Sequence, residues 1–406
     1  MVPTRSEGGP TTSVPTPSTR QTAVGSARGT IRTLPRAEQR SAPEQRSAPE
    51  QRSAPEQRSA PEQPSAPESD IVPVVAIAFE ALGTSCRVVV GGSPDDAGLA
   101  AAAADEIRRL ERRWSRFLPD SEISQLNRHP GRMTIVSAST FDLVRRAEQA
   151  RVATAGRFNP LLLDQLEAAG YRRSWLEARP DGIPDPDAEL SPGADHPVSG
   201  SGEPIELLAE VHGVRLPTGT RFDPGGLGKG LAVDRLTEWC RDEGATTVCV
   251  DLGGDLRVHG EPWYGPRWRI GVDHPFAPGT ELGAFTPAEG AVTTSTTLRR
   301  TWVGPGGERR HHLIDPATGR PSASDVVAVT TCSSQAWWAE VAAKAALLAG
   351  SAAALGVLAE LGTPGIAVTA DGGILRWNGG PHPYDEERDS DGAADGGGGG
   401  AGRTAA

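Results

Sequence analysis

The sequence predicts an α+β fold, with mixed or antiparallel sheets and packed helices. The segment 71–92 is rich in β-branched residues and is interrupted by Gly83, as a hairpin is, and 246–259 returns to a strand pattern. The segment 95–117 places its apolar residues at the spacing of one helix face. Because strands clustered in hairpins alternate with helices, the pattern favours α+β over a doubly wound parallel sheet.

Composition confines this fold to the middle of the chain. The 406 residues include 49 Gly and 35 Pro, so a sizeable part is unsuited to a packed core. The unit Ser-Ala-Pro-Glu-Gln-Arg begins at Ser41 and recurs at Ser47, and a repeat without an apolar face cannot bury a core. We therefore expect a disordered tail over 1–70, a globular domain over 71–378 and a disordered Gly/Asp-rich tail over 379–406.

The elements of the domain follow in order. Gly83 breaks the run 71–92 and predicts a hairpin, and Asp95 or Asp96 is the expected N-cap of the helix over 95–117. Gly350 is expected to end the last predicted helix. Further helices are predicted over 139–152, 161–169, 227–242 and 336–348, strands over 211–222, 246–259, 268–272 and 326–331, and a loop over 176–205.

The charge and hydropathy of the chain argue against two classes of protein. The formal net charge is −11, and because residues 1–70 carry +1 and residues 380–406 carry −4, the middle carries −8. Such an acidic domain is a poor binder of nucleic acid. No run approaches 18 apolar residues, so we expect no membrane span. The N-terminal residues lack the apolar core of a signal peptide and a cysteine for a lipid, so a cytoplasmic location is expected.

Cysteine and lysine are both scarce. The four cysteines show neither a C-x-x-C pair nor zinc-like spacing, and their apolar neighbours predict small buried hydrophobic residues. Among 41 Lys and Arg residues only Lys229 and Lys344 are lysines. Both lie in segments with the features of functional motifs.

The most distinctive of these segments, 223–234, joins a predicted strand to a predicted helix. Its glycines let the backbone approach a ligand closely, and the free N–H groups of the helix start can bind an anion. Lys229 adds a positive charge, which suits a phosphate or diphosphate. Gly230 follows Lys229, so this is not a P-loop, and the glycines do not follow G-x-G-x-x-G. An ordinary glycine-rich helix start explains the segment equally well.

Two further segments lie close to predicted strands. In 250–258, paired glycines interrupt an apolar run, which indicates a bulge, a close approach of another segment or, more simply, a kink. In 311–321, His312 and Asp315 have the spacing of a general base and its orienting carboxylate. A tight turn beside a surface histidine is the simpler interpretation of that segment alone.

The predicted helix over 336–348 carries a charged pair on an apolar background. Glu340 and Lys344 are four residues apart and therefore share one helix face. An exposed salt bridge is one interpretation. Because the helix is apolar nearly all round, we favour a functional pair.

Taken together and in this order, these segments resemble the ApbE family of FAD:protein FMN transferases. The likeness extends over about 76–371 and rests on several separate motifs in the family's order. They are 81–84 (ALGT), 117–127 (FLPDSEISQLN), 158–160 (FNP), 223–234 (DPGGLGKGLAVD), 253–255 (GGD), 292–295 (VTTS) and 312–319 (HLIDPATG).

The resemblance implies a fold that holds FAD in an extended cleft. It also implies an enzyme that transfers the FMN half of FAD onto a Ser or Thr hydroxyl of an acceptor protein, with release of AMP. His312 matches the family's proposed base, with Asp315 in its turn, while Lys229 and Lys344 would converge on the diphosphate from separate helices. Residues on or beside family FAD contacts are Leu82, Asn127, Phe158, Asn159, Asp223, Lys229 and Val292.

The sequence departs from the family where magnesium is bound. Family members carry A-D-A-x-x-T on the last helix, where a backbone oxygen, Asp and Thr are the ligands. Here the backbone oxygen belongs to Ala339, Glu340 replaces Asp and Lys344 replaces Thr. An ammonium cannot coordinate Mg²⁺ and repels it. Leu82 also replaces the methionine on the flavin side.

Three hypotheses follow from this departure. In the first, the chain is a flavin transferase in which the Lys344 ammonium takes over the charge role of the metal. In the second, Glu340 still binds Mg²⁺ and Lys344 turns away. In the third, the chain is an FAD-binding protein of the same fold that has lost transfer activity.

Overall fold

The structure, a computed structural model, describes three stretches of the chain: residues 72–174, 202–304 and 306–378. The disordered tails predicted over 1–70 and 379–406 lie outside the described residues, as does most of the loop predicted over 176–205.

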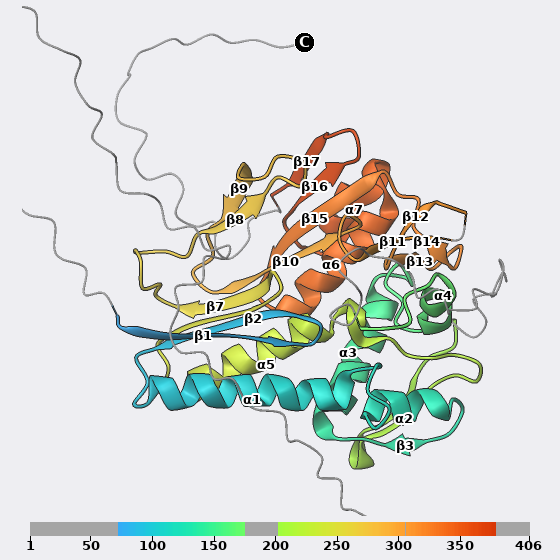
Figure 1. The fold of residues 1–406 in the computed structure, drawn as a ribbon, viewed down its shortest axis with the longest axis horizontal. Coiled ribbons are helices and arrows are strands. Elements are labelled where there is room, and N and C mark those ends of the chain that lie inside the picture. Colours follow the sequence, from blue (N-terminus) through green and yellow to red (C-terminus); the bar gives the residue numbers. More distant parts are fainter. Residues whose placement is uncertain (1–71, 175–201, 305, 379–406) are drawn as a thin grey trace, which may run out of the picture.

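The centre of the fold is an eight-stranded sheet in which neighbouring strands are antiparallel (Figure 1). With its packed helices, this sheet confirms the predicted α+β class, and the predicted hairpin around Gly83 forms its first two strands. In spatial order the strands are β1 (Val74–Ala81), β2 (Thr84–Gly91), β6 (Thr247–Leu252), β7 (Asp255–Gly260), β10 (Gly290–Thr296), β15 (Val326–Ser333), β16 (Gly365–Thr369) and β17 (Ile374–Trp377).

Four helices cover one face of this sheet (Figure 1). The predicted N-cap of the first is Asp95, whose carboxylate accepts a hydrogen bond from the Gly98 amide at 2.9 Å. Gly350 ends the third, as predicted, with a φ of 76° that favours glycine. The four are α1 (Asp96–Trp114), α5 (Gly228–Asp242), α6 (Ala336–Ala349) and α7 (Ser351–Glu360).

Alternation along the strands separates two layers of core. Val88 and Val90 pack toward the helices, whereas Val89 between them packs on the opposite face with Trp268. A hairpin adds Ile270 and Phe285 to that opposite layer. Its strands are β8 (Ile270–Asp273) and β9 (Glu281–Phe285).

Shorter elements lie at one side of the molecule (Figure 1). The helices predicted over 139–152 and 161–169 are confirmed there, together with a short helix inside the 117–127 motif. They are α2 (Glu122–Arg128), α3 (Ala138–Ala153) and α4 (Leu163–Ala168), beside a small sheet of β3 (Thr134–Ile135), β5 (Gly213–Arg215) and β4 (Glu206–Leu208). Near them run the hairpins of β11 (Thr301–Val303) with β12 (Arg309–His311) and β13 (Ile314–Asp315) with β14 (Arg320–Pro321).

Two predictions need correction. The strand predicted over 211–222 is limited to β5, because Thr220 donates a backbone hydrogen bond to Pro217 and closes a turn. The paired glycines 253 and 254 form neither a bulge nor a kink but the two-residue turn between β6 and β7, with φ of 72° and 94°. A close approach does occur there, since a Cβ on Gly253 would collide with the Thr84 hydroxyl.

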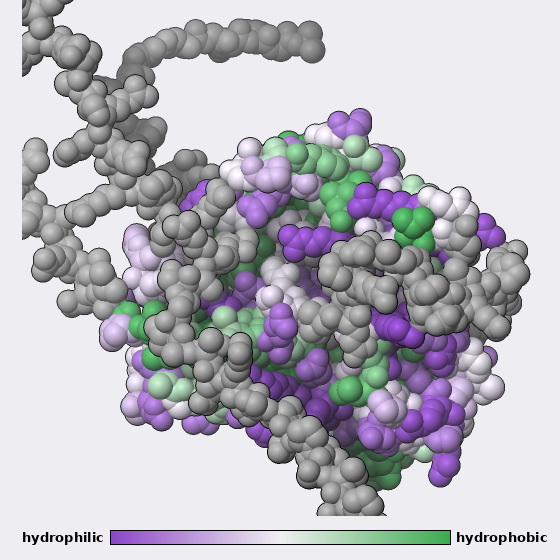
Figure 2. All heavy atoms as spheres, in the orientation of Figure 1, coloured by the Kyte–Doolittle hydropathy of each residue, from purple (hydrophilic) through white to green (hydrophobic). Residues whose placement is uncertain are grey.

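The surface and the cysteines agree with the composition. Figure 2 shows hydrophilic side chains gathered over α1 and α2, while hydrophobic ones form separate groups. None of the helices in the described stretches is both long and apolar enough to cross a membrane. The cysteines are buried and free, as predicted: Cys86, Cys240, Cys249 and Cys332.

Candidate functional site

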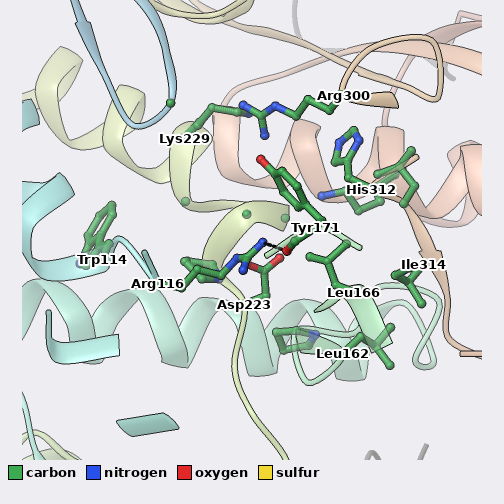
Figure 3. A pocket seen from close by; sticks show the side chains of 18 of the residues that line it. Trp114, Arg116, Leu162, Leu166, Tyr171, Asp223, Lys229, Arg300, His312 and Ile314 are labelled. Atoms are coloured by element: carbon green, nitrogen blue, oxygen red, sulfur yellow. Dashed lines mark hydrogen bonds and ion pairs between the residues drawn. The ribbon is translucent and has the colours of Figure 1, made fainter. Parts of the chain in front are cut away.

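A pocket opens where the turn after β1 and the start of α5 face the loops that follow α1 and α3 (Figure 3). Its walls combine an apolar side with several charged side chains. Of the residues predicted from the sequence, those that line it are Leu82, Phe158, Asn159, Asp223, Lys229, His312 and Lys344.

Two glycines let α5 begin inside this pocket. A Cβ on Gly226 would lie 2.5 Å from a ring carbon of Phe158 and 3.0 Å from Lys344 Nζ. A Cβ on Gly230 would lie 2.6 Å from the backbone oxygen of Ala336. The glycines of the 223–234 motif therefore allow α5 to pass in direct contact with the start of α6.

Asp234 fixes the crossing of these helices. Its carboxylate accepts hydrogen bonds from the amides of Ala336 and Trp337, at 2.8 and 2.9 Å, and thereby caps α6. It also pairs with the Arg257 guanidinium at 3.0 Å. Burial raises the pKa of Asp234 to about 6, although Arg257 and the two amides act in the opposite direction. The last residue of the motif thus positions the helix that carries Glu340 and Lys344.

Lys229 is held between two carboxylates. Its ammonium donates to Glu340 Oε1 at 3.0 Å and to the Asp255 carboxylate, while Glu340 Oε2 accepts from the Gly230 amide at 3.0 Å. Burial lowers the pKa of Lys229, but the two carboxylates outweigh burial and the resulting pKa is raised. Burial in turn raises the pKa of Glu340, but Lys229 and Lys344 outweigh it and lower that pKa. Lys229 is therefore a permanently protonated anchor between α5, α6 and β7.

Lys344 is arranged differently. Its ammonium lies 5.8 Å from the centroid of the Phe158 ring and forms no ion pair or hydrogen bond within the described part of the chain. The exposed Glu340–Lys344 salt bridge that helical spacing allowed is not formed, because Glu340 binds Lys229 instead. Burial lowers the pKa of Lys344, and the charge of Lys229 adds to this, while Glu340 opposes it. The ammonium is thus available to an anionic ligand.

His312 lies in the same pocket with an unsatisfied ring nitrogen. Its Nδ1 is buried and has no hydrogen-bond partner among the described residues. Burial lowers the pKa of His312 well below its usual value, and the positive charges of Arg300 and Lys344 lower it further. The imidazole is therefore neutral near pH 7 and able to accept a proton.

Sequence patterns gave no role to Arg300, although it also lines the pocket. It follows β10 with a left-handed φ of 52°. In Figure 3 its side chain and that of Lys229 extend toward one another, with the His312 ring beside them. The chain contains 39 arginines, and Arg300 lies in no recognisable motif. Local sequence therefore does not distinguish it as a functional residue.

Arg116 and Tyr171 were missed as well. The Arg116 guanidinium pairs with Asp223 at 3.2 Å and lies 4.1 Å from the ring centroid of Phe117 and 4.9 Å from that of Tyr171 (Figure 3). This stack forms one wall of the pocket and compensates the charge of Asp223. Arg116 directly precedes Phe117, the first residue of the 117–127 motif. This position was the one feature of the sequence that indicated a role for Arg116 in the site.

Other predicted residues lie outside the pocket lining. Asn127 exchanges hydrogen bonds with the backbone of Phe222, at 2.7 and 2.9 Å, and thereby positions the segment that enters Asp223. Val292 is buried in the core of the sheet. The Asp315 carboxylate accepts from the Ala317 amide at 2.9 Å within its own turn, so the structure does not bring it to His312.

The residues at the expected magnesium position do not fit a divalent cation. Both oxygens of Glu340 already accept hydrogen bonds, and the backbone oxygen of Ala339 accepts one from Thr331 at 2.9 Å. Lys344 places a positive charge on the next turn of the helix. No group of three His, Cys, Asp or Glu side chains in the described stretches could hold a metal ion.

Fold and site together define a protein of the α+β class with a pocket lined by cationic side chains beside a glycine-rich helix start. Residues 82–368 match the model of the ApbE family. The chain therefore belongs to the ApbE family.

Curated relatives and solved structures agree. The chain is 28% identical over 226 residues to an FAD:protein FMN transferase from Vibrio cholerae. The aligned region covers 55% of this chain and 65% of the relative. It is 26% identical over 307 residues to one from Treponema pallidum, covering 70% and 81%. The structure of the ApbE protein from Thermotoga maritima superposes with a TM-score of 0.65 at 27% identity, covering 75% of this chain and 97% of that one. The flavin transferase ApbE from Vibrio cholerae, at 22% identity and a TM-score of 0.62, supports the fold.

Proposed function

We propose that this protein transfers the FMN half of FAD onto a Ser or Thr hydroxyl of an acceptor protein and releases AMP. The observation that carries this function is the neutral His312 ring, with its buried and unpartnered Nδ1, in a pocket that also holds Lys229, Arg300 and Lys344. A base beside several cations suits a reaction in which a hydroxyl attacks a diphosphate. Its relatives from Vibrio cholerae and Treponema pallidum are FAD:protein FMN transferases.

The reaction can be written with its bonds and protons balanced. The acceptor hydroxyl oxygen forms a bond to the phosphorus on the FMN side of the diphosphate. The bond from that phosphorus to the bridging oxygen breaks, and AMP leaves with the bridging oxygen. His312 accepts the hydroxyl proton and returns it to solvent.

The charges around His312 give the substrate a second role. In the free protein, burial and the neighbouring cations lower the pKa of His312, which keeps the ring in its basic form. A bound diphosphate offsets those positive charges, so it raises the pKa of His312 and strengthens the base where the hydroxyl proton must be accepted. The stack of Arg116 on Tyr171 offers an aromatic and cationic wall for the rest of the FAD.

The test is an incubation of purified protein with FAD and a peptide from a candidate acceptor. We expect one AMP for each flavin attached to the peptide. In His312→Asn, transfer should fall about 10²–10⁴-fold while FAD still binds. Bound FAD without AMP release from the unaltered protein would instead identify an FAD-binding protein that has lost transfer.

A further inference from the structure

The cations of the pocket differ in whether a carboxylate already compensates them. Lys229 is bound by Asp255 and Glu340, and Arg116 by Asp223. Within the described part of the chain, Lys344 and Arg300 form no ion pair. The pocket therefore contains two cationic side chains that no carboxylate contacts directly among the described residues.

Lys344 is held in place by apolar packing. Its helix, α6, buries most of its length, and the ammonium emerges beside Phe158 and the backbone at Gly226. Holding an ammonium in such surroundings without a direct ion pair costs free energy, which a bound anion recovers. Glu340, one turn earlier, attracts Lys344 without forming an ion pair with it, and its oxygens accept from Lys229 and the Gly230 amide instead.

The backbone at Arg300 has an uncommon conformation. A φ of 52° is rare for a residue other than glycine and persists where the surrounding structure enforces it. In this position its charge opposes the protonation of both His312 and Lys229. An anion that enters the pocket would relieve this mutual repulsion.

We propose that Lys344 and Arg300 together take the place of a divalent cation at the diphosphate, so that this chain binds FAD and transfers FMN without Mg²⁺. The proposal rests on the proposed function for its transfer step. Two positive charges at the pocket match the two negative charges of a diphosphate, and the acidic residue at the expected metal position, Glu340, is already bound to Lys229. The cationic side chains thus stabilise the charge that develops on the leaving AMP.

The experiment measures FAD binding by flavin fluorescence, and AMP release, in EDTA and in Mg²⁺. We expect the unaltered protein to give the same Kd and the same rate in both. Lys344→Met and Arg300→Gln should each weaken FAD binding about 10- to 100-fold, and Mg²⁺ should restore neither. Lys344→Arg should retain more binding than Lys344→Met. Arg309→Gln, which removes an exposed arginine near the same hairpins, serves as the control and should bind FAD normally.

Other outcomes overturn the proposal. It is wrong if EDTA abolishes transfer and Mg²⁺ restores it, or if Mg²⁺ tightens FAD binding by the unaltered protein. It is also wrong if both Lys344→Met and Arg300→Gln bind FAD normally. Absence of AMP release under every condition would refute the proposed transferase function instead, and the binding measurements would still decide whether the two cations replace a metal.

Discussion

The Lys229 ammonium on α5 donates a hydrogen bond to Glu340 on α6 at 3.0 Å, across 111 residues of sequence. The other oxygen of this carboxylate, Oε2, accepts a hydrogen bond from the Gly230 amide. This link ties the glycine-rich helix start to the helix that carries Lys344. It also removes Glu340 from the ligands available to a metal.

Removal of the Lys229 charge should destabilise the fold. Lys229→Met leaves Asp255 and Glu340 close together and buried, without the ammonium that pairs with both. Breaking a buried ion pair in this way costs about 3–5 kcal/mol. We expect a corresponding decrease in the free energy of unfolding, measured with urea. The double variant with Glu340→Gln should recover part of the loss, whereas equal stability of Lys229→Met and the unaltered protein would refute the role of the link.

The crossing of α5 and α6 should tolerate no side chain at Gly230. In Gly230→Ala the new methyl group lies within 2.6 Å of the backbone of Ala336, so the helices must move apart. We expect a loss of about 1–3 kcal/mol in unfolding free energy, together with weaker FAD binding. Gly356→Ala on α7 is the matched control. Among the described residues, no atom beyond the nearby backbone of α7 itself lies within 4 Å of its new Cβ, so it should stabilise the protein by about 0.5–1 kcal/mol.

How much of this site was predictable depends on the distance between its parts in the sequence. The hairpin at Gly83, the cap at Asp95 and the end of α6 at Gly350 follow from local patterns, because a turn or a cap is decided by a few adjacent residues. Lys229 and His312 were singled out because each lies in a short motif of unusual composition. Both line the pocket.

Contacts between distant segments were not predictable in the same way. Helical spacing allowed Glu340 to pair with Lys344, but the partner is Lys229, which approaches only because Gly230 lets α5 contact α6. Arg300 lies close enough to His312 to lower its pKa, at a left-handed backbone position that no residue around it indicates. Tertiary packing decides such contacts, and a single sequence carries no local record of it.

The pH dependence of transfer should report the charge around His312. Because its pKa is lowered in the free protein, the ring stays in its basic form below pH 6.5, and kcat/KM should remain constant down to at least that pH. The acid limb of the kcat/KM profile should therefore lie below pH 6.5. Bound diphosphate raises the pKa, so the acid limb of kcat should lie at higher pH than that of kcat/KM.

The variant Arg300→Gln separates this interpretation from a purely structural role. Loss of one positive charge raises the pKa of His312, so the acid limb of kcat/KM should move to higher pH. The measurement is the transfer rate at low FAD concentration across the pH range. An unchanged acid limb in Arg300→Gln would show that Arg300 does not act on His312 through its charge.

The wall formed by Arg116 should depend on a planar guanidinium. Arg116→Lys keeps the charge opposite Asp223 but loses the stack on Phe117 and Tyr171. We expect weaker FAD binding, measured by fluorescence titration. The control is Arg108→Lys. The Arg108 guanidinium lies 4.9 Å from the ring centroid of Phe79, away from the pocket, so the variant removes a comparable stack there. It should leave FAD binding unchanged.

The most direct measurement is a crystal structure of the protein with FAD, prepared in EDTA. We expect diphosphate oxygens within hydrogen-bond distance of the ammonium of Lys344 and the guanidinium of Arg300, with the diphosphate beside His312. A diphosphate bound elsewhere would contradict this, as would a complex that forms only after Mg²⁺ is added and holds the metal between Glu340 and the phosphates.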